Sequence, residues 1–311
     1  MVPMPGRTHE QEFTQVTSQD TNLFCFGLGF TGSALVRVLQ ARGWAVAGTC
    51  REKVHQDLWD RAGVRAYAFD GKTASREIGQ ALAEVSHVLV TIPPHKEDGD
   101  VVLRHFRNAL ARSSGLRWLG YLSTTGVYGN RDGEWVDESS ELKPVFDHQK
   151  RRAEAESQWF DLYRGHGVPV HVFRLAGIYG PGRNLLERVR RGVAKRIDQP
   201  GLVFNRIHVD DVEQTLAASM ERPHPGAIYN VVDDLPAAPA EAVAFACELL
   251  NVDAPPLVPL DEAGLSEMGR GFYLTNKKVR NRKINEELGV TLHYPDYRSG
   301  LRSLLEQEQK G

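Results

Sequence analysis

Residues 22–51 read NLFCFGLGFTGSALVRVLQARGWAVAGTCR and predict a strand, a glycine turn, a helix and a second strand. An apolar run precedes Gly27, Gly29 and Gly32, which have the spacing GxGxxG. The first glycine of such a turn permits the tight bend, the second admits a pyrophosphate, and the third lets helix and strand approach closely. The helix N-terminus then offers free N–H groups to phosphates. The stretch predicts a dinucleotide site, with a purely structural glycine turn as the alternative.

The end of the second strand bears on which dinucleotide is bound. An NAD-selective site usually has a carboxylate about 20 residues after the motif, on the ribose hydroxyl. Here the strand ends with Cys50 and Arg51. The missing carboxylate removes repulsion of a 2′-phosphate, and a guanidinium binds phosphate well. We therefore expect NADP, with NAD as the alternative if Arg51 is only a solvated charge.

Composition excludes several classes of protein. The 311 residues carry a net charge of −2, so no basic field indicates a nucleic-acid partner. Three isolated cysteines form neither a disulfide framework nor a metal motif, which favours a reducing cytoplasm and no metal site. No apolar run is long enough to span a membrane. Residues 1–21 are polar and mixed in charge, and we expect a disordered leader outside the fold.

Strand-like and helix-like segments alternate through the first half of the chain. This alternation predicts an α/β fold of the Rossmann type, a doubly wound parallel sheet covered on both faces. Ligands of such sheets gather at the carboxyl ends of the strands. Prolines and glycines break the pattern after Gly180. We therefore expect a dinucleotide-binding domain at 22–180, joined by about 205–234, and a small α/β substrate lobe at 181–204 and 235–311.

A second group of hydroxyls follows the predicted strand 118–123. Thr124 and Thr125 lead into Gly126, Val127 and Tyr128. Hydroxyls just beyond a parallel strand lie where a substrate would bind and can polarise a carbonyl by hydrogen bonding. Taken alone, these residues are better explained as a serine- and threonine-rich turn.

Four motifs that occur in order favour a functional role for these hydroxyls over a structural turn. They are LSTTGVYG at 122–129, RLAGIYGPGRN at 174–184, IHVDDV at 207–212 and IYNV at 228–231. From residue 23 to about 301 their order and spacing resemble the extended short-chain dehydrogenases/reductases, in particular the NAD-dependent epimerase/dehydratase branch. The resemblance implies a Rossmann sheet of about seven strands with a small C-terminal substrate lobe. It also implies a homodimer formed through the segments 101–112 and 149–164. Relatives include nucleotide-sugar epimerases, dehydratases and carbonyl reductases.

The resemblance implies a role for individual residues. Thr124 matches the catalytic serine or threonine, and Lys150 matches the lysine at the nicotinamide ribose, with Glu154 four residues later. Arg51 would meet the adenosine ribose or its phosphate, and Asp70 the adenine amine. The remaining cofactor contacts would be Gly27, Gly29, Phe30, Thr31, Gly32, Thr91, Pro93, Ala176, Gly177 and Ile178.

The sequence departs from the family at the catalytic tyrosine. The family's YxxxK reads Phe146 to Lys150 here, as in atypical members that retain the cofactor fold. Phenylalanine has no proton to exchange with the substrate. Tyr128 is the preferred surrogate, with packing in the wall as the alternative. His148 has a suitable pKa but would point away from Phe146 on a helix.

Two functions therefore remain open. One is an NAD(P)-dependent oxidoreductase, epimerase or dehydratase acting on a carbonyl- or sugar-like substrate. The other is a non-catalytic regulator or scaffold that senses NADP(H). A basic run, Arg188, Arg190, Arg191, Lys195 and Arg196, would either hold an anionic substrate such as a nucleotide diphosphate or form a solvated helix face.

Overall fold

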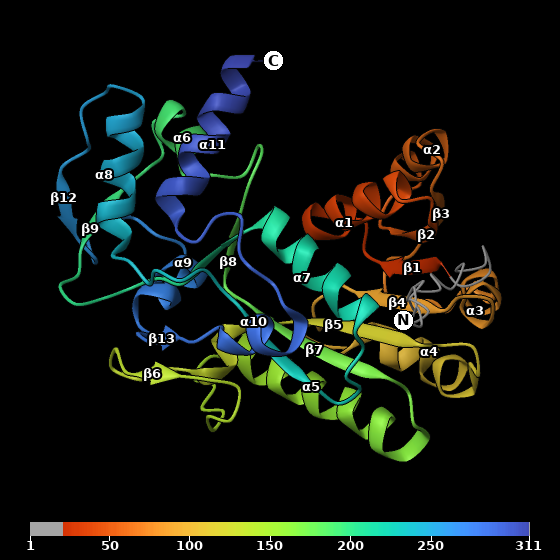
Figure 1. Ribbon diagram of the computed structural model, residues 1–311. Coiled ribbons are helices and arrows are strands. Elements are labelled where there is room, and N and C mark those ends of the chain that lie inside the picture. The colour runs from red at the N-terminus through yellow and green to blue at the C-terminus, as the bar shows by residue number, and fades with distance from the viewer. Residues whose placement is uncertain (1–20, 311) are drawn as a thin grey trace, which may run out of the picture.

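The computed structural model of the protein describes residues 21–310, and a parallel sheet of seven strands forms its centre (Figure 1). The expected leader, apart from Thr21, lies outside the described residues. In spatial order the strands are β11 (Ile228–Val231), β7 (Val170–Leu175), β5 (Trp118–Thr124), β4 (His87–Val90), β1 (Asn22–Phe26), β2 (Ala45–Cys50) and β3 (Arg65–Ala68). Every neighbouring pair runs parallel. The expected Rossmann-type fold is confirmed.

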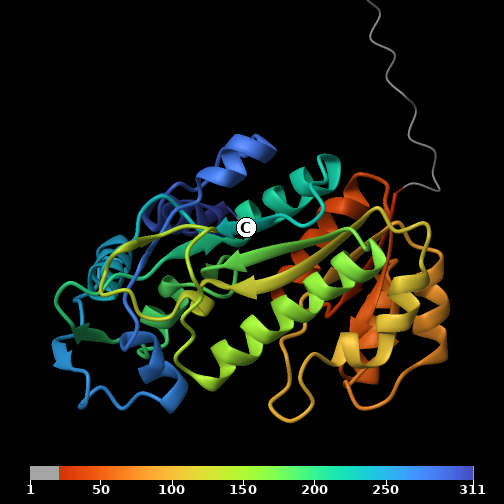
Figure 2. The same cartoon turned by 90° about the horizontal axis from the view of Figure 1, so that it is seen from below.

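Both faces of the sheet are covered by helices. One face packs against α3 (Arg76–Ala83), α4 (Val101–Arg112) and α5 (Asp147–His166). The other packs against α1 (Phe30–Ala41), α7 (Val209–Glu221) and α10 (Arg282–Leu288). Figure 2 shows α5 and α7 on opposite sides of the strands. The short helix α2 (Lys53–Arg61) lies beside β2 and β3.

This burial explains why the central strands are apolar along their whole length. All residues of β4, and all those of β5 except Thr124, are buried. A strand covered on both faces has no position for a solvated side chain, so the polar–apolar alternation of a one-sided sheet is absent. Strand order reverses at β1, which lies between β2 and β4. A crevice at the carboxyl ends of strands is expected at such a switch point.

A smaller lobe lies beyond the carboxyl ends of the strands (Figure 1). Two parallel strands, β8 (Gly177–Tyr179) and β10 (Arg206–His208), lead toward it. The lobe contains α6 (Leu185–Arg190), β9 (Arg196–Asp198), α8 (Pro239–Leu249), β12 (Leu257–Pro259), α9 (Glu267–Tyr273) and α11 (Tyr297–Lys310). The pair β6 (Trp135–Val136) and β13 (Lys278–Val279) borders it.

The apolar contacts of the lobe are partly its own and partly shared. Helices α6, α8 and α11 enclose a separate cluster that includes Leu186, Ala246 and Leu301. In contrast, Ile284, Leu288 and Val290 pack with the sheet-face cluster. The segment around α10, which we expected in the lobe, therefore returns to the sheet.

No helix within residues 21–310 is both long and apolar enough to cross a bilayer.

Candidate functional site

The three glycines of the turn between β1 and α1 differ in what surrounds them. Gly27 has a φ of +98°, in the left-handed region, and a Cβ there would lie 2.4 Å from Thr91 Oγ1. A Cβ on Gly32 would lie 2.3 Å from the Gly27 carbonyl oxygen. A Cβ on Gly29 would meet nothing within 4 Å. Gly27 and Gly32 are therefore required by the turn, whereas Gly29 faces open space where a ligand can approach.

Two threonines fix this turn from neighbouring strands. The Gly27 N–H donates to Thr49 Oγ1 at 2.9 Å, and Thr91 Oγ1 donates to the Gly27 carbonyl at 2.8 Å. Thr49 is the penultimate residue of β2 and is 1% exposed, while Thr91 directly follows β4. The turn is thus held on both sides before any ligand binds.

The N-terminus of α1 is prepared for an anion. Gly29 is the N-cap, so no side chain caps the first N–H groups, and the first turn holds no acidic residue. Unpaired N–H groups and the helix dipole together favour phosphate at this position. The turn and helix therefore fit the pyrophosphate of a dinucleotide.

A groove of about 320 Å³ extends from this turn across the ends of β1, β4, β5 and β7. Its lining includes the expected residues Gly29, Phe30, Thr31, Thr91, Thr124, Ala176 and Ile178, together with Leu122, Ser123, Arg152, Leu175 and Arg183. Thr124 ends β5, and its hydroxyl accepts from the Gly126 N–H at 3.1 Å. That contact leaves the Thr124 proton free for a ligand.

The α5 cation that lines the groove is Arg152 rather than Lys150. Arg152 lines the groove and donates to the Leu122 carbonyl at 2.8 Å. Lys150 is not among the lining residues described; its side chain is 59% exposed and its Nζ lies 3.7 Å from Asp147 Oδ1. The physical reason is helix phase. Arg152 lies on the side of α5 that carries buried Glu156 and Trp159, whereas Lys150 and Glu154 face solvent.

Glu156 holds a buried network behind the groove. It receives hydrogen bonds from the hydroxyl of Ser123, which lines the groove, and from the guanidinium of Arg174. Arg174 also donates to the Tyr128 hydroxyl at 2.9 Å. A lining residue is thereby connected to a buried ion pair.

Tyr128 belongs to this network and not to the groove surface. It ends the 3₁₀ helix η1 (Thr125–Tyr128), is 0% exposed, and its hydroxyl donates to Asn230 Oδ1 at 2.8 Å. Burial raises the pKa of Tyr128 to about 12. Its proton is committed to Asn230, so the structure supports packing in the wall, the alternative to a role as proton donor.

Phe146 directly precedes α5 as its N-cap residue. Its ring is stacked with that of His148, with 5.8 Å between ring centroids, and lies beside Gly271 of α9. His148 is exposed on the helical face of Arg152, one turn earlier. Burial and the charges of Arg151 and Arg152 lower the pKa of His148.

The other expected cofactor residues lie around the groove without lining it. Arg51 follows β2 and is exposed. Asp70 follows β3, is exposed, and accepts from the Lys72 N–H at 2.9 Å. Pro93 is exposed after β4, and Gly177 begins β8, where it lines a second cavity. Arg51 and Asp70 both follow strands on the β2–β3 side of the glycine turn.

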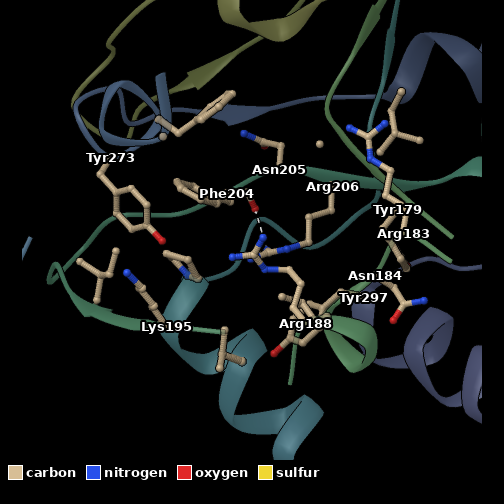
Figure 3. Close-up of a pocket in the computed structure, with 18 of the residues that line it drawn as sticks. Tyr179, Arg183, Asn184, Arg188, Lys195, Phe204, Asn205, Arg206, Tyr273 and Tyr297 are labelled. Atoms are coloured by element: carbon tan, nitrogen blue, oxygen red, sulfur yellow. Dashed lines mark hydrogen bonds between the residues drawn. The ribbon is translucent and has the colours of Figure 1, made fainter. Parts of the chain in front are cut away.

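The second cavity lies in the lobe and measures about 440 Å³ (Figure 3). Ile178 and Arg183 line both this cavity and the groove, so the two spaces adjoin. The Arg183 guanidinium lies 5.3 Å from the centre of the Phe30 ring, at the junction. A ligand in the lobe cavity can therefore face a ligand in the groove.

Only some residues of the basic run 188–196 lie at the lobe cavity. Arg188 and Lys195 line the lobe cavity. Arg190 instead forms ion pairs with Glu187 and Glu308, and Arg196 donates to the Pro255 carbonyl. Arg206, which the sequence did not single out, is the fourth cation of the cavity with Arg183.

His208 and Asp211 have structural roles at α7. His208 caps the helix by accepting from the Asp210 N–H at 3.2 Å, and Asp211 accepts from the N–H groups of His293 and Tyr294.

Sequence reasoning missed Arg152 and Arg206. Arg152 had a signal, since placing Trp159 and Leu162 in the core fixes the phase of α5 and turns Arg152 toward the sheet. Arg206 had no local signal, because its place in the cavity depends on long-range packing.

Comparison with known proteins agrees with this geometry. Residues 27–232 match the NAD dependent epimerase/dehydratase family. Protein YeeZ of Escherichia coli (strain K12) is 27% identical over 281 residues, covering 87% of this chain and 95% of that protein. A functionally unknown conserved protein from Silicibacter pomeroyi DSS is 44% identical, with a TM-score of 0.85 and coverage of 92% of this chain and 99% of that one.

A characterised structure shares the fold. The UDP-glucose 4-epimerase of Thermotoga maritima, solved with UDP-glucose, is 18% identical, with a TM-score of 0.76 over 93% of this chain and 99% of that one. The expected resemblance is confirmed: the chain belongs to the NAD-dependent epimerase/dehydratase family, within the extended short-chain dehydrogenases/reductases.

Proposed function

We propose that the protein is an NAD(P)-dependent enzyme, an oxidoreductase, epimerase or dehydratase, acting on a carbonyl or hydroxyl group of a small molecule. The observation that carries the proposal is the junction of groove and lobe cavity at Ile178 and Arg183. A cofactor in the first space and a substrate in the second would meet beside Thr124. Pockets of this size, with few convergent polar groups, are typical of small-molecule sites.

The cofactor would be held by the glycine turn and α1, with Arg152 at the opposite wall of the groove. When bound, the nicotinamide supplies or accepts hydride. The Thr124 hydroxyl would donate to the substrate oxygen, since it accepts from the Gly126 N–H and its own proton is left free. Arg152 would supply the positive charge for which the sequence suggested Lys150.

Two finer features follow from the same residues. Arg51, exposed after β2 with Cys50 in place of a carboxylate, supports NADP over NAD. Three free cysteines, two of them buried, support a cytoplasmic location. Helices α4 and α5, which pack together, would form the homodimer contact that the family implies.

A second candidate is a non-catalytic NADP(H)-sensing regulator or scaffold. One observation favours it: among the described residues that line the groove, none is a tyrosine. Phe146 offers no proton, and the Tyr128 proton is committed to Asn230. The adjoining lobe cavity favours the enzyme, because a sensor needs no second site for a small molecule.

Two measurements test the proposal. Calorimetric titration should detect binding of NADPH, and Gly32→Val should abolish it because a side chain there meets the turn backbone. A screen of carbonyl compounds with NADPH should then find turnover that Thr124→Ala removes. The control is Thr125→Ala, a neighbouring buried hydroxyl outside the groove lining. Binding without turnover across broad panels would favour the sensor.

A further inference from the structure

The charged residues described in the lining of the lobe cavity are all positive. Of its described lining residues, four are cations, Arg183, Arg188, Lys195 and Arg206, and none is Asp or Glu. None of the four takes part in an ion pair among the described residues. Nearby Arg190, in contrast, has two carboxylate partners. Like charges that lie together without counter-charges repel one another, and a bound anion would reduce that repulsion.

The guanidinium of Arg206 is the most enclosed of these cations. It donates to the carbonyls of Phe204 and Ala237 at 3.1 and 3.2 Å, which are neutral acceptors. Burial lowers the pKa of Arg206, although its positive charge is retained. The carboxylate of buried Asp233 attracts the Arg206 charge, but among the described residues it forms no ion pair with Arg206 and does not line the cavity. An anionic ligand would offset the remaining cost of taking that charge out of water.

The neutral amides of the cavity are already occupied. Asn184 donates to the Gly180 carbonyl and accepts from the Glu187 N–H. Asn205 donates to the Lys277 carbonyl and accepts from the Val279 N–H. These bonds hold the loops in place and use one N–H donor and one lone pair of each amide, which leaves fewer groups for the hydroxyls of a sugar.

The tyrosines add a donor but few acceptors. Tyr179 uses its hydroxyl on the Asp296 carbonyl, and the Tyr297 hydroxyl is enclosed and unpaired. The Tyr273 hydroxyl has no hydrogen bond among the described residues, and burial raises the pKa of Tyr273. Figure 3 shows this hydroxyl and the guanidinium groups of Arg188 and Arg206 pointing toward the same central space.

The remaining walls are apolar. They comprise Ile178, Leu185, Ile197, Phe204, Pro239, Val243, Leu265, Phe272 and Leu301. Hexose hydroxyls need acceptors as well as donors, and carboxylates usually supply them. Here the free side-chain groups are the cations and the Tyr273 phenol, set in an apolar wall, since the unpaired Tyr297 hydroxyl is enclosed.

We infer that the lobe cavity binds a small organic anion with an apolar body, a carboxylate or a phosphate ester, rather than a sugar nucleotide. The inference deepens the proposed function and rests on it in one respect, that the lobe cavity is the substrate site. The anionic group would lie between Arg188 and Arg206 beside the Tyr273 hydroxyl. The apolar body would lie on the aliphatic and aromatic walls, with the reactive carbon directed past Arg183 toward Thr124.

The test is calorimetric titration of the full chain with matched probes: naphthylacetate, its neutral amide naphthylacetamide, naphthyl phosphate and UDP-glucose. We expect at least one acid to bind about tenfold or more tightly than the amide, the scale of one charged hydrogen bond. The tighter of the two acids identifies the anionic group. Equal affinity for acid and amide would overturn the inference, as would tighter binding of UDP-glucose in competition with the acids.

A variant pair locates the site. Arg188→Gln should weaken binding of the acid by about tenfold or more. Arg190→Gln removes the same charge two residues away, outside the cavity lining, and should leave affinity unchanged. Equal weakening by both would show a diffuse charge effect and refute the site. Lys195→Gln repeats the test should Arg188→Gln fail to fold.

Parallel titration with NADPH separates this inference from the proposed function. If NADPH binds and neither acid does, the inference about the substrate class is wrong and cofactor binding stands. If an acid binds in the Arg188-dependent manner and no nicotinamide cofactor does, the ligand class stands and the proposed enzyme is refuted.

Discussion

Glu156 and Arg174 form an ion pair, with 2.7 Å between Glu156 Oε2 and an Arg174 terminal nitrogen, whose side chains are 3% and 4% exposed. Ser123 of the groove and Tyr128 behind it are both bonded to this pair. A buried ion pair is tolerated only while both charges are present, because one charge left alone in the interior has no solvent to stabilise it.

We therefore expect Glu156→Ala to lower the free energy of unfolding by about 3–5 kcal/mol, since it strands the Arg174 charge. The matched control is Glu154→Ala, on the exposed face of the same helix, which should change stability by less than about 0.5 kcal/mol. Urea denaturation of both variants measures the difference. Similar losses in the two would mean that the pair adds nothing beyond loss of a helix carboxylate.

Arg152 and Lys150 offer a test of which cation serves the groove. Arg152→Met should weaken NADPH binding by about tenfold or more, the effect of losing one charged contact. Lys150→Met should have little effect, because its ammonium group is exposed and lies beside Asp147. Fluorescence titration of NADPH compares the two. Impairment by Lys150→Met with normal binding by Arg152→Met would restore the assignment made from sequence.

Cofactor preference depends on Arg51. We expect NADPH to bind more tightly than NADH, and Arg51→Ala to cost NADPH alone about 1–3 kcal/mol. Calorimetry with both cofactors on both proteins gives the four affinities required. An equal loss for NADH and NADPH would show that Arg51 does not contact the 2′-phosphate.

Two buried histidines predict loss of stability in acid. Burial lowers the pKa of His87 and of His171 to about 4. An unfolded histidine titrates near pH 6.5, so between that pH and about 4 the unfolded chain binds more protons. The free energy of unfolding should therefore fall as pH falls through this window, by of the order of 1–3 kcal/mol for each histidine.

The slope of stability against pH is the readout, because substitution also changes packing. His171→Gln should flatten the slope between about pH 6.5 and 4, whereas His166→Gln, at an exposed position, should not. Parallel slopes for wild type and His171→Gln would contradict the assignment.

The sequence was sufficient for the sheet, because each strand is a short, largely apolar run between breakers and the central runs are buried on both faces. It was also sufficient for the glycine turn, where the requirement for glycine at positions 27 and 32 is local. The sequence was less reliable in predicting which face of α5 points toward the sheet. Spacing of four residues fits both Lys150 with Glu154 and Arg152 with Glu156, and only the packing of Trp159 and Leu162 decides between them.

The lobe was the least predictable part. The helix α11 was not expected, and α10 returns to the sheet although its sequence resembles any short polar helix. Arg206 lies in the cavity because β10 pairs with β8, a contact between segments about thirty residues apart that no local pattern indicates. The charge of the cavity is thus a property of tertiary structure.

The chain passes repeatedly between the sheet and the lobe (Figure 1). β8 leaves the sheet region, β10 and α7 return to it, and α10 returns once more before α11. Asp211 of α7 further ties down the segment before α11 by accepting from His293 and Tyr294. A hinge rotation of the lobe would have to bend all these connections together. These connections resist a change in the separation between Arg188 and Thr124, so under the proposed function we expect substrates to be selected by their length as well as by their charge.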